Sequence, residues 1–329
     1  MLTTCCSVGN SILRFISEMI YGRRAERVTV QSPLFIIGHW RTGTTLLHEL
    51  LALDERFGYP STIACIQPHH FLLSERLLKH LLRWLLPSPR VMDNMPNGPQ
   101  RPQEDEFALC NLGVPSPYVS LAFPHRAAQS ADALDVEMLP AADRQRWQRG
   151  LLWFLRRLSV RDARRLVLKS PTHTARIKAI LEVFPDAQFI HLVRDPFVVF
   201  PSTVHTWKSL RGVQSLQGPD DSDVDEYVFT SFERMYAAFD RDRPLVDPAN
   251  FFELRYEDLV RDISGSLHAM YDHLRLGDFE AVRAQFEHFE TESGGYRTNR
   301  YDISADLKNK IARRWKTQIH RWGYTGDTR

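Results

Sequence analysis

A turn that joins a short apolar run to a helical pattern carries the strongest chemical signal in this sequence. The turn contains Gly38 and Gly43. Four leucines follow it at helical spacing: Leu46, Leu47, Leu50 and Leu51. Glycines let backbone amides approach anionic oxygens, and the N-terminus of a helix adds unpaired N–H groups and a favourable dipole. The segment therefore predicts a loop that binds phosphate.

This loop lacks the lysine of nucleotide hydrolases and related kinases. Its glycine spacing fits the Walker pattern GxxxxGK[ST], in which the lysine reaches the β- and γ-phosphates. Thr44 stands at the lysine position, and Thr45 follows it. The sequence therefore predicts phosphate binding without hydrolase chemistry, and a P-loop kinase-like phosphotransferase is the less favoured alternative.

The loop and a second segment resemble the two cofactor motifs of sulfotransferases that use 3′-phosphoadenosine 5′-phosphosulfate (PAPS). The residues that match the 5′-phosphosulfate loop of that family are Arg41, Thr42, Gly43, Thr44 and Thr45. The second segment is similar to the family's 3′-phosphate motif, with Arg194 at a strand end and Ser202 about two helical turns later. Both residues are therefore expected to hold the 3′-phosphate of the cofactor.

Further matches extend the resemblance from residue 33 to residue 324, closest to the bacterial and tyrosylprotein branch of the family. The resemblance implies an enzyme that moves the sulfuryl group of PAPS to an acceptor hydroxyl by in-line displacement and releases PAP. It implies that Arg41 holds the 5′-phosphate and sulfuryl oxygens. Lys169 matches the cation that meets charge growing on the bridging oxygen. Tyr236 matches, loosely, a residue that stacks on adenine, and a core aromatic residue of its helix is the favoured alternative.

An attacking hydroxyl must lose its proton, so a general base is expected near Lys169. Glu106 belongs to an acidic trio, residues 104–106, that opens an apolar helical stretch, where desolvation raises the pKa of a carboxylate. Glu104 of the same trio is the reserve candidate. His173 competes because imidazole titrates near neutral pH, although the N-terminal turn of a helix disfavours its charged form. We favour Glu106 and keep His173 as the alternative.

The elements that must position these residues follow from apolar patterning. Short apolar runs at residues 34–37, 166–168, 189–193 and 251–255 are each followed by a helical pattern. This alternation predicts an α/β fold, a P-loop-like parallel sheet flanked by helices, in a single domain over residues 1–329. Ser170 and Pro171 predict a helix start at the second run, and Asp195 and Pro196 predict one at the third. Pro201 is expected to kink the latter helix.

Composition limits the classes of function. The chain has 329 residues, of which 43% are hydrophobic, so it can bury a large core. A formal net charge of +2 argues against nucleic acid as the main partner. The four cysteines show neither metal-ligand spacing nor a dense disulfide framework, which favours a reducing cytoplasm and no metal cofactor.

The remaining segments bear on membrane contact and on the acceptor site. Residues 11–28 predict an amphipathic helix, and contact of that helix with a membrane surface is the alternative to packing on its own domain. No apolar run reaches the roughly 18 residues of a membrane span. Residues 87–102 and 214–225 predict irregular loops, and residues 57–125 are expected to build the acceptor pocket. The acceptor stays open among sugar, phenol, lipid and peptide, as does the oligomeric state. A catalytically silent PAPS-binding scaffold is a further alternative.

Overall fold

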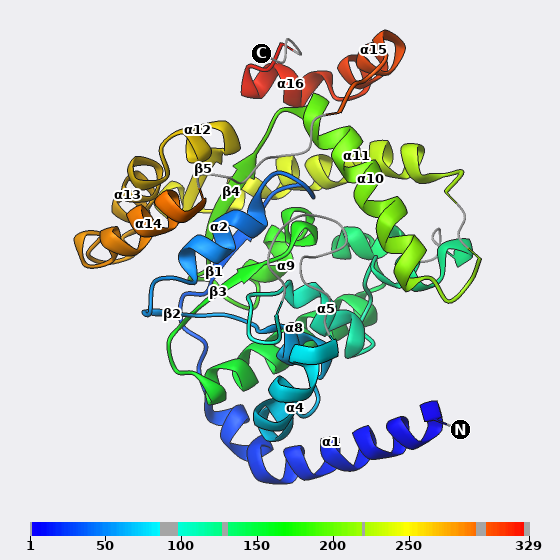
Figure 1. The fold of residues 1–329 in the computed structure, drawn as a ribbon, viewed down its shortest axis with the longest axis vertical. Helices are drawn as coiled ribbons and strands as arrows, with labels where there is room; N and C mark the ends of the chain where they lie inside the picture. Colours follow the sequence, from blue (N-terminus) through cyan, green and yellow to red (C-terminus); the bar gives the residue numbers. More distant parts are fainter. Residues whose placement is uncertain (1, 86–97, 127–130, 219–220, 294–300, 326–329) are drawn as a thin grey trace.

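The computed structural model describes residues 2–85, 98–126, 131–218, 221–293 and 301–325. A parallel sheet of five strands, in the order β2-β3-β1-β4-β5, lies at the centre of these described residues (Figure 1). Its strands are β1 (Leu34–Ile37), β2 (Phe57–Gly58), β3 (Arg165–Lys169), β4 (Gln188–Val193) and β5 (Phe251–Arg255). The α/β fold with a parallel sheet is therefore confirmed.

The central strand β1 is buried on both faces. Phe35 and Ile37 enter one apolar cluster, whereas Leu34 and Ile36 enter a second cluster on the opposite face. A continuous apolar run is typical of a strand that helices cover on both sides. The two cores therefore explain why this run lacks the polar alternation of a half-exposed strand.

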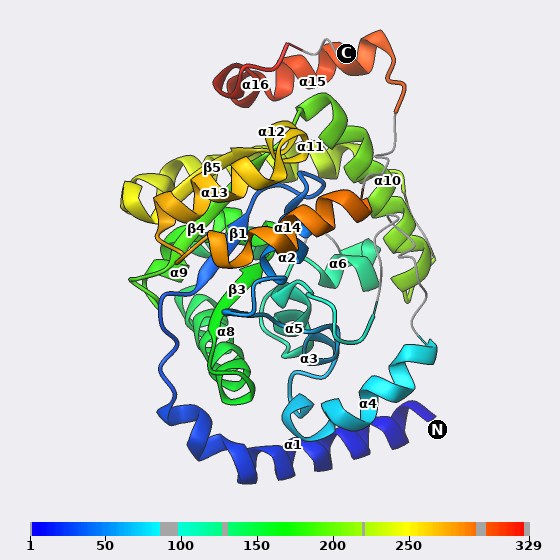
Figure 2. The same cartoon turned by 60° about the vertical axis from the view of Figure 1, so that its left-hand side comes forward.

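Helices surround the sheet on both faces and at both ends. The first cluster takes side chains from α3 (Thr62–Ile66), α4 (Phe71–Leu85), α5 (Asp105–Asn111), α6 (Val119–Ala122), α8 (Ala141–Arg161), α9 (Ile177–Leu181), α10 (Pro196–Gln214), α11 (Val224–Asp242), α15 (Ala305–Arg314) and α16 (Lys316–Trp322). The second takes them from α2 (Thr44–Leu51), α12 (Tyr256–Arg261), α13 (Ile263–Leu274) and α14 (Glu280–Ser293). Helix α1 (Leu2–Arg27) lies along the base of the molecule in both views (Figures 1 and 2).

Short 3-10 segments connect the larger elements. They are η1 (Pro124–Arg126), η2 (Ala131–Leu134), η3 (Val136–Met138), η4 (Pro171–Ala175), η5 (Arg243–Leu245) and η6 (Pro248–Asn250).

None of the helices in the described residues is long and apolar enough to cross a membrane.

The predicted strands match closely. β1 and β5 have the predicted bounds, and β3 and β4 extend the predicted runs by one or two residues. β2 was not predicted, because two residues are too few to show any periodicity. Asp195 caps α10 as predicted, since its side chain accepts a hydrogen bond from the Phe197 N–H at 2.9 Å. Pro201 lies inside α10, and the helix continues on both sides of it.

The segment after β3 differs from its prediction. Instead of one helix that begins at Pro171, the chain forms the 3-10 segment η4 and then the short helix α9. Ser170 makes no capping hydrogen bond, and Arg176 leaves the helical region with φ −133°. The side chains of Thr172, His173 and Thr174 instead bond to residues outside this segment. These tertiary contacts outweigh the local helical pattern.

The predicted N-terminal helix and the predicted loop at residues 214–225 have ends close to those of the observed elements. α1 begins before the predicted residues 11–28 and ends at Arg27. The predicted loop at residues 214–225 spans the interval between the end of α10 and the start of α11 at Val224. Residues 86–97, most of the predicted irregular segment 87–102, lie outside the described residues.

Candidate active site

The turn between β1 and α2 has a shape that requires its glycines. Gly38 and Gly43 adopt φ values of 143° and 95°, in the region that favours glycine. A Cβ atom on Gly38 would lie 2.4 Å from the Leu192 carbonyl oxygen, and one on Gly43 would lie 2.3 Å from the Tyr256 ring. Arg41 also has positive φ, at 70°. The backbone therefore curls tightly ahead of α2, whose N-cap is Gly43.

Two buried hydroxyl groups hold this turn in place. The Thr42 hydroxyl donates to the His39 carbonyl at 2.8 Å, and the Gly38 N–H donates to the Thr174 hydroxyl at 2.7 Å. The second bond ties the turn to η4, beyond the end of the neighbouring strand β3. These bonds within the protein hold the loop in its curled shape, which suits an anion site at the N-terminus of a helix.

The structure brings Arg41, Arg194 and Ser202 together. Arg41 Nε donates to the Ser202 hydroxyl at 2.9 Å, and Arg194 Nη1 donates to the Arg41 carbonyl at 3.0 Å. The Arg194 guanidinium also lies over the Tyr256 ring, 4.1 Å from its centroid. Two guanidinium groups and a hydroxyl thus converge where β1 and β4 end, an arrangement suited to phosphate oxygens.

Lys169, the last residue of β3, links this loop to a carboxylate. Its Nζ atom donates to Glu104 Oε1 at 2.7 Å and to the Thr45 hydroxyl at 3.3 Å. The lysine side chain is 2% exposed and that of Glu104 is 15% exposed. A buried cation therefore stands between the anion loop and a carboxylate that solvent still reaches.

A family model described as the sulfotransferase family matches residues 33–281. The match covers the phosphate loop, Lys169 and the pair Arg194 and Ser202.

The chain belongs to the sulfotransferase family.

Curated relatives and solved structures agree with this assignment. Two mycobacterial proteins, from Mycobacterium bovis and Mycobacterium tuberculosis, are each 43% identical over all 329 residues, which cover 84% of each relative. Both are named omega-hydroxy-beta-dihydromenaquinone-9 sulfotransferase. A sulfotransferase structure from Mycobacterium avium shares the fold with a TM-score of 0.73 at 20% identity, over 93% of this chain and 81% of that chain. Another, from Mycobacterium tuberculosis, has a TM-score of 0.65 at 21% identity and the same coverages.

In this sulfotransferase, aromatic residues border Glu104 and hold its second oxygen. The Tyr118 hydroxyl donates to Glu104 Oε2 and accepts a hydrogen bond from Trp40 Nε1 at 3.0 Å. Burial, together with the charge of Glu104, raises the pKa of Tyr118 well above its usual 10.0, so the phenol stays protonated. The rings of Phe107 and Trp207 also contact the Tyr118 ring. Glu104 thus lies beside an apolar wall.

Glu106, the favoured base from the sequence, occupies a different environment. Its carboxylate is fully buried and forms an ion pair with Arg176. It also accepts hydrogen bonds from Ser116 at 2.6 Å and from Thr172 at 2.9 Å. These partners occupy both carboxylate oxygens, and full burial leaves no solvent-exposed face for an acceptor. The geometry therefore argues against Glu106 as the base, whereas Glu104, the reserve candidate, is the carboxylate that contacts Lys169.

His173 is likewise part of the core. Its Nε2 atom lies 2.6 Å from Asp105 Oδ2, both side chains are fully buried, and Phe35 and Trp147 contact the imidazole edge-on. Burial alone would raise the pKa of Asp105, but the charge and hydrogen bond of His173 outweigh burial and lower it. The pair joins α5 to η4, so a structural role accounts for its contacts.

Tyr236 does not present a face to adenine in this structure. It is 0% exposed, and its ring packs against Phe232, Phe239 and Trp322 in the core. Tyr236 therefore packs as a core aromatic residue, which is the alternative that the sequence favours, and the stacking role finds no exposed ring face in this structure. Its i, i+3, i+4 neighbours in α11 already identify it as a core residue.

Trp40 and Tyr118 were missed by sequence reasoning. Trp40 precedes the matched loop residues, and Tyr118 lies in a short Ser-Pro-Tyr segment with no periodic pattern. Only their contact through the Tyr118 hydroxyl shows that they belong to the site.

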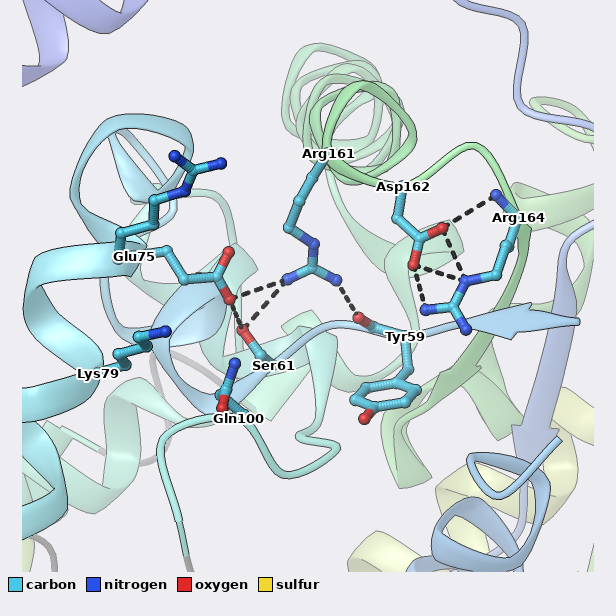
Figure 3. A pocket seen from close by; sticks show the side chains of 9 residues that line it. Tyr59, Ser61, Glu75, Lys79, Gln100, Arg161, Asp162 and Arg164 are labelled. Carbon is cyan, nitrogen blue, oxygen red and sulfur yellow. Dashed lines mark hydrogen bonds and ion pairs between the residues drawn. The ribbon is translucent and has the colours of Figure 1, made fainter. Parts of the chain in front are cut away.

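A separate hollow of 360 Å³ lies between α4 and the end of α8 (Figure 3). Arg161 reaches Glu75 at 3.4 Å across it, and Arg164 pairs with Asp162 at 2.5 Å. Most of its charge is therefore paired within the protein, and its lining contains none of the candidate site residues. Across the described ranges, no group of three or more His, Cys, Asp or Glu side chains could hold a metal ion.

Proposed function

We propose that this sulfotransferase transfers the sulfuryl group of PAPS to a hydroxyl group of a lipid acceptor, a hydroxylated menaquinone derivative. The observation that carries the proposal is the position of Lys169, whose Nζ atom contacts both Thr45 of the phosphate loop and Glu104. A cation there can meet the leaving group while the carboxylate beside it meets the incoming hydroxyl.

The donor side of the proposal uses the converging cations. Arg41, Thr42, Gly43, Thr44 and Thr45 would hold the 5′-phosphosulfate, because their turn offers backbone amides at the start of α2. Arg194 and Ser202 would hold the 3′-phosphate, and both residues contact Arg41 of the proposed 5′-phosphosulfate site. This arrangement supports PAPS as the donor.

The proposed reaction is an in-line displacement. The acceptor oxygen forms a bond to sulfur as the bond from sulfur to the bridging oxygen breaks, and PAP leaves with the electron pair. Lys169 stabilises the charge that grows on that oxygen. Glu104 accepts the proton of the hydroxyl, and Tyr118 orients its carboxylate through the second oxygen. The sulfuryl group carries less charge than a phosphoryl group, so we propose that no metal ion is required.

The acceptor side rests on two supports. The 43%-identical relatives are named for a hydroxylated dihydromenaquinone. In addition, the wall beside Glu104 is aromatic, built from Phe107 and Tyr118 within the predicted acceptor region, residues 57–125, with Trp40 and Trp207 beyond it. An apolar wall suits a lipid better than a sugar or a charged peptide. The cytoplasm, favoured by the cysteine content, is the proposed place of the reaction.

Family membership argues against the kinase alternative, and the contact of Lys169 with Glu104 argues against a silent scaffold. The test follows label transfer from radiolabelled PAPS to a hydroxylated menaquinone, a sugar, a phenol and a tyrosine peptide. We expect label on the menaquinone alone. Label on another acceptor would replace the lipid in the proposal. Tight PAP binding without any transfer would establish the scaffold.

A further inference from the structure

Helix α1 directs six large apolar side chains away from the protein. They have relative exposures between 38% and 70% and are Val8, Ile12, Phe15, Ile16, Met19 and Ile20. Their spacing of three and four residues places them along one stripe of the helix. Surface helices of globular proteins show the opposite orientation, with the apolar stripe against the core.

The fully buried residues of α1 are small, and Leu13 and Tyr21 are half-buried beside them. Ser17 and Ala25 are buried, as is Gly22. Glu18 forms an ion pair with Arg157 of α8 at 2.5 Å, and Asn10 contacts His70 at 3.2 Å. These contacts fix the helix on α8 and beside α4, so the outward direction of the apolar stripe is set by the fold.

The charge on α1 indicates what covers this stripe. The helix carries Arg14, Arg23, Arg24 and Arg27 against Glu18 and Glu26, and Glu18 is engaged by Arg157. Three of the arginines cluster in the last two turns. An apolar stripe with arginines at its end suits a surface that is both apolar and anionic, which is the property of a membrane with anionic lipids.

We propose that α1 is a membrane-docking helix that lies in the headgroup region of an anionic bilayer, with its apolar stripe toward the acyl chains. At 26 residues it is about 39 Å long, and it runs along the base of the molecule in both views (Figures 1 and 2). Docking would keep the enzyme at the surface where a lipid acceptor resides. That consequence rests on the proposed function, whereas the docking itself does not.

The test is sedimentation of the full chain with lipid vesicles, in the absence of PAPS and acceptor. The wild type should bind vesicles of phosphatidylglycerol and phosphatidylcholine more tightly than vesicles of phosphatidylcholine alone. The combined variant Ile12→Ser, Phe15→Ser and Met19→Ser should lower the partition constant at least about tenfold. Its matched control changes three residues of similar exposure, 55% to 66%, elsewhere on the surface: Met138→Ser, Val213→Ser and Leu245→Ser. The control should bind as the wild type does.

A second variant and a second measurement separate charge from folding effects. Replacing Arg23, Arg24 and Arg27 with Gln should weaken binding to the anionic vesicles and leave binding to phosphatidylcholine unchanged. In the otherwise unaltered protein, Met19→Trp should gain fluorescence that brominated lipids quench, whereas Leu245→Trp should not. This measurement does not depend on the stability of the triple variant.

Two results would overturn the proposal. One is a wild type that stays in the supernatant with both kinds of vesicle. The other is vesicle binding that survives the three serine substitutions on α1. A dimer in analytical ultracentrifugation that these substitutions dissociate, without vesicle binding by the wild type, would assign the stripe to a second copy of the chain instead. Because the assay contains no PAPS, failure of the proposed reaction would leave these results unchanged.

Discussion

Replacing Glu104 with Gln tests whether Glu104 or Glu106 of the acidic trio is the general base. The amide keeps the size of the side chain and can still bond to Tyr118, but it cannot accept the proton of an attacking hydroxyl. In the structure the carboxylate lies 2.7 Å from Lys169 Nζ, next to the phosphate loop, and is partly exposed. Loss of a general base lowers turnover by about 10²- to 10⁴-fold, or about 2.7–5.4 kcal/mol of activation free energy.

The matched control is Glu106→Gln, two residues further along α5. It breaks a fully buried ion pair with Arg176, which costs about 3–5 kcal/mol of folding free energy. It does not alter the group that faces Lys169. Glu106→Gln should therefore lower the unfolding midpoint while the turnover per folded molecule stays within about threefold of the wild type.

The assay is label transfer from PAPS at saturating donor, with the folded fraction measured by circular dichroism and PAP affinity by calorimetry. Glu104→Gln should bind PAP as the wild type does, because Arg41, Arg194 and Ser202 are unchanged. Near-normal turnover in Glu104→Gln beside a collapsed turnover in folded Glu106→Gln would refute the reasoning and restore Glu106 as the base.

Four further predictions follow from the same geometry. The protein should bind PAP at least about tenfold more tightly than AMP, and Arg194→Ala with Ser202→Ala should abolish that preference in calorimetry; equal affinities in the wild type would contradict the 3′-phosphate site. Lys169→Ala should keep PAP affinity and lose about 10²-fold or more in turnover, whereas loss of PAP binding with normal turnover would show ground-state anchoring. Transfer should survive excess EDTA, and loss that Mg²⁺ restores would refute a metal-free reaction. Burial lowers the pKa of His39 from 6.5 to about 3, so below pH 6.5 the unfolded chain binds the proton and the folded protein does not. As the pH falls from 6.5 toward 3, the free energy of unfolding should therefore decrease by up to about 1.4 kcal/mol per pH unit through this one residue. His39→Gln should remove this contribution to the slope in denaturant melts at a series of pH values.

Local patterns account for most of the fold. The runs that became β1 and β5 were bounded by breakers, and β1 is apolar throughout, a pattern that a short segment displays by itself. The same holds for Asp195, whose cap depends on a residue two positions away. The helix expected from Pro171 failed because Thr172, His173 and Thr174 bond to residues far along the chain.

The sequence alone predicted the turn of the proposed donor site, because the positive φ values of Gly38, Arg41 and Gly43 belong to a local backbone conformation that adjacent residues set. It located the acidic trio and Lys169 but could not choose among the carboxylates. Successive residues of a helix point in different directions, so Glu104 and Glu106 diverge. Only the position of β3, 65 residues further along the chain, decides which of them meets Lys169. The tertiary structure also decided the direction of the apolar stripe of α1. Periodicity shows that a helix has an apolar side, but packing decides whether that side faces the core or the solvent.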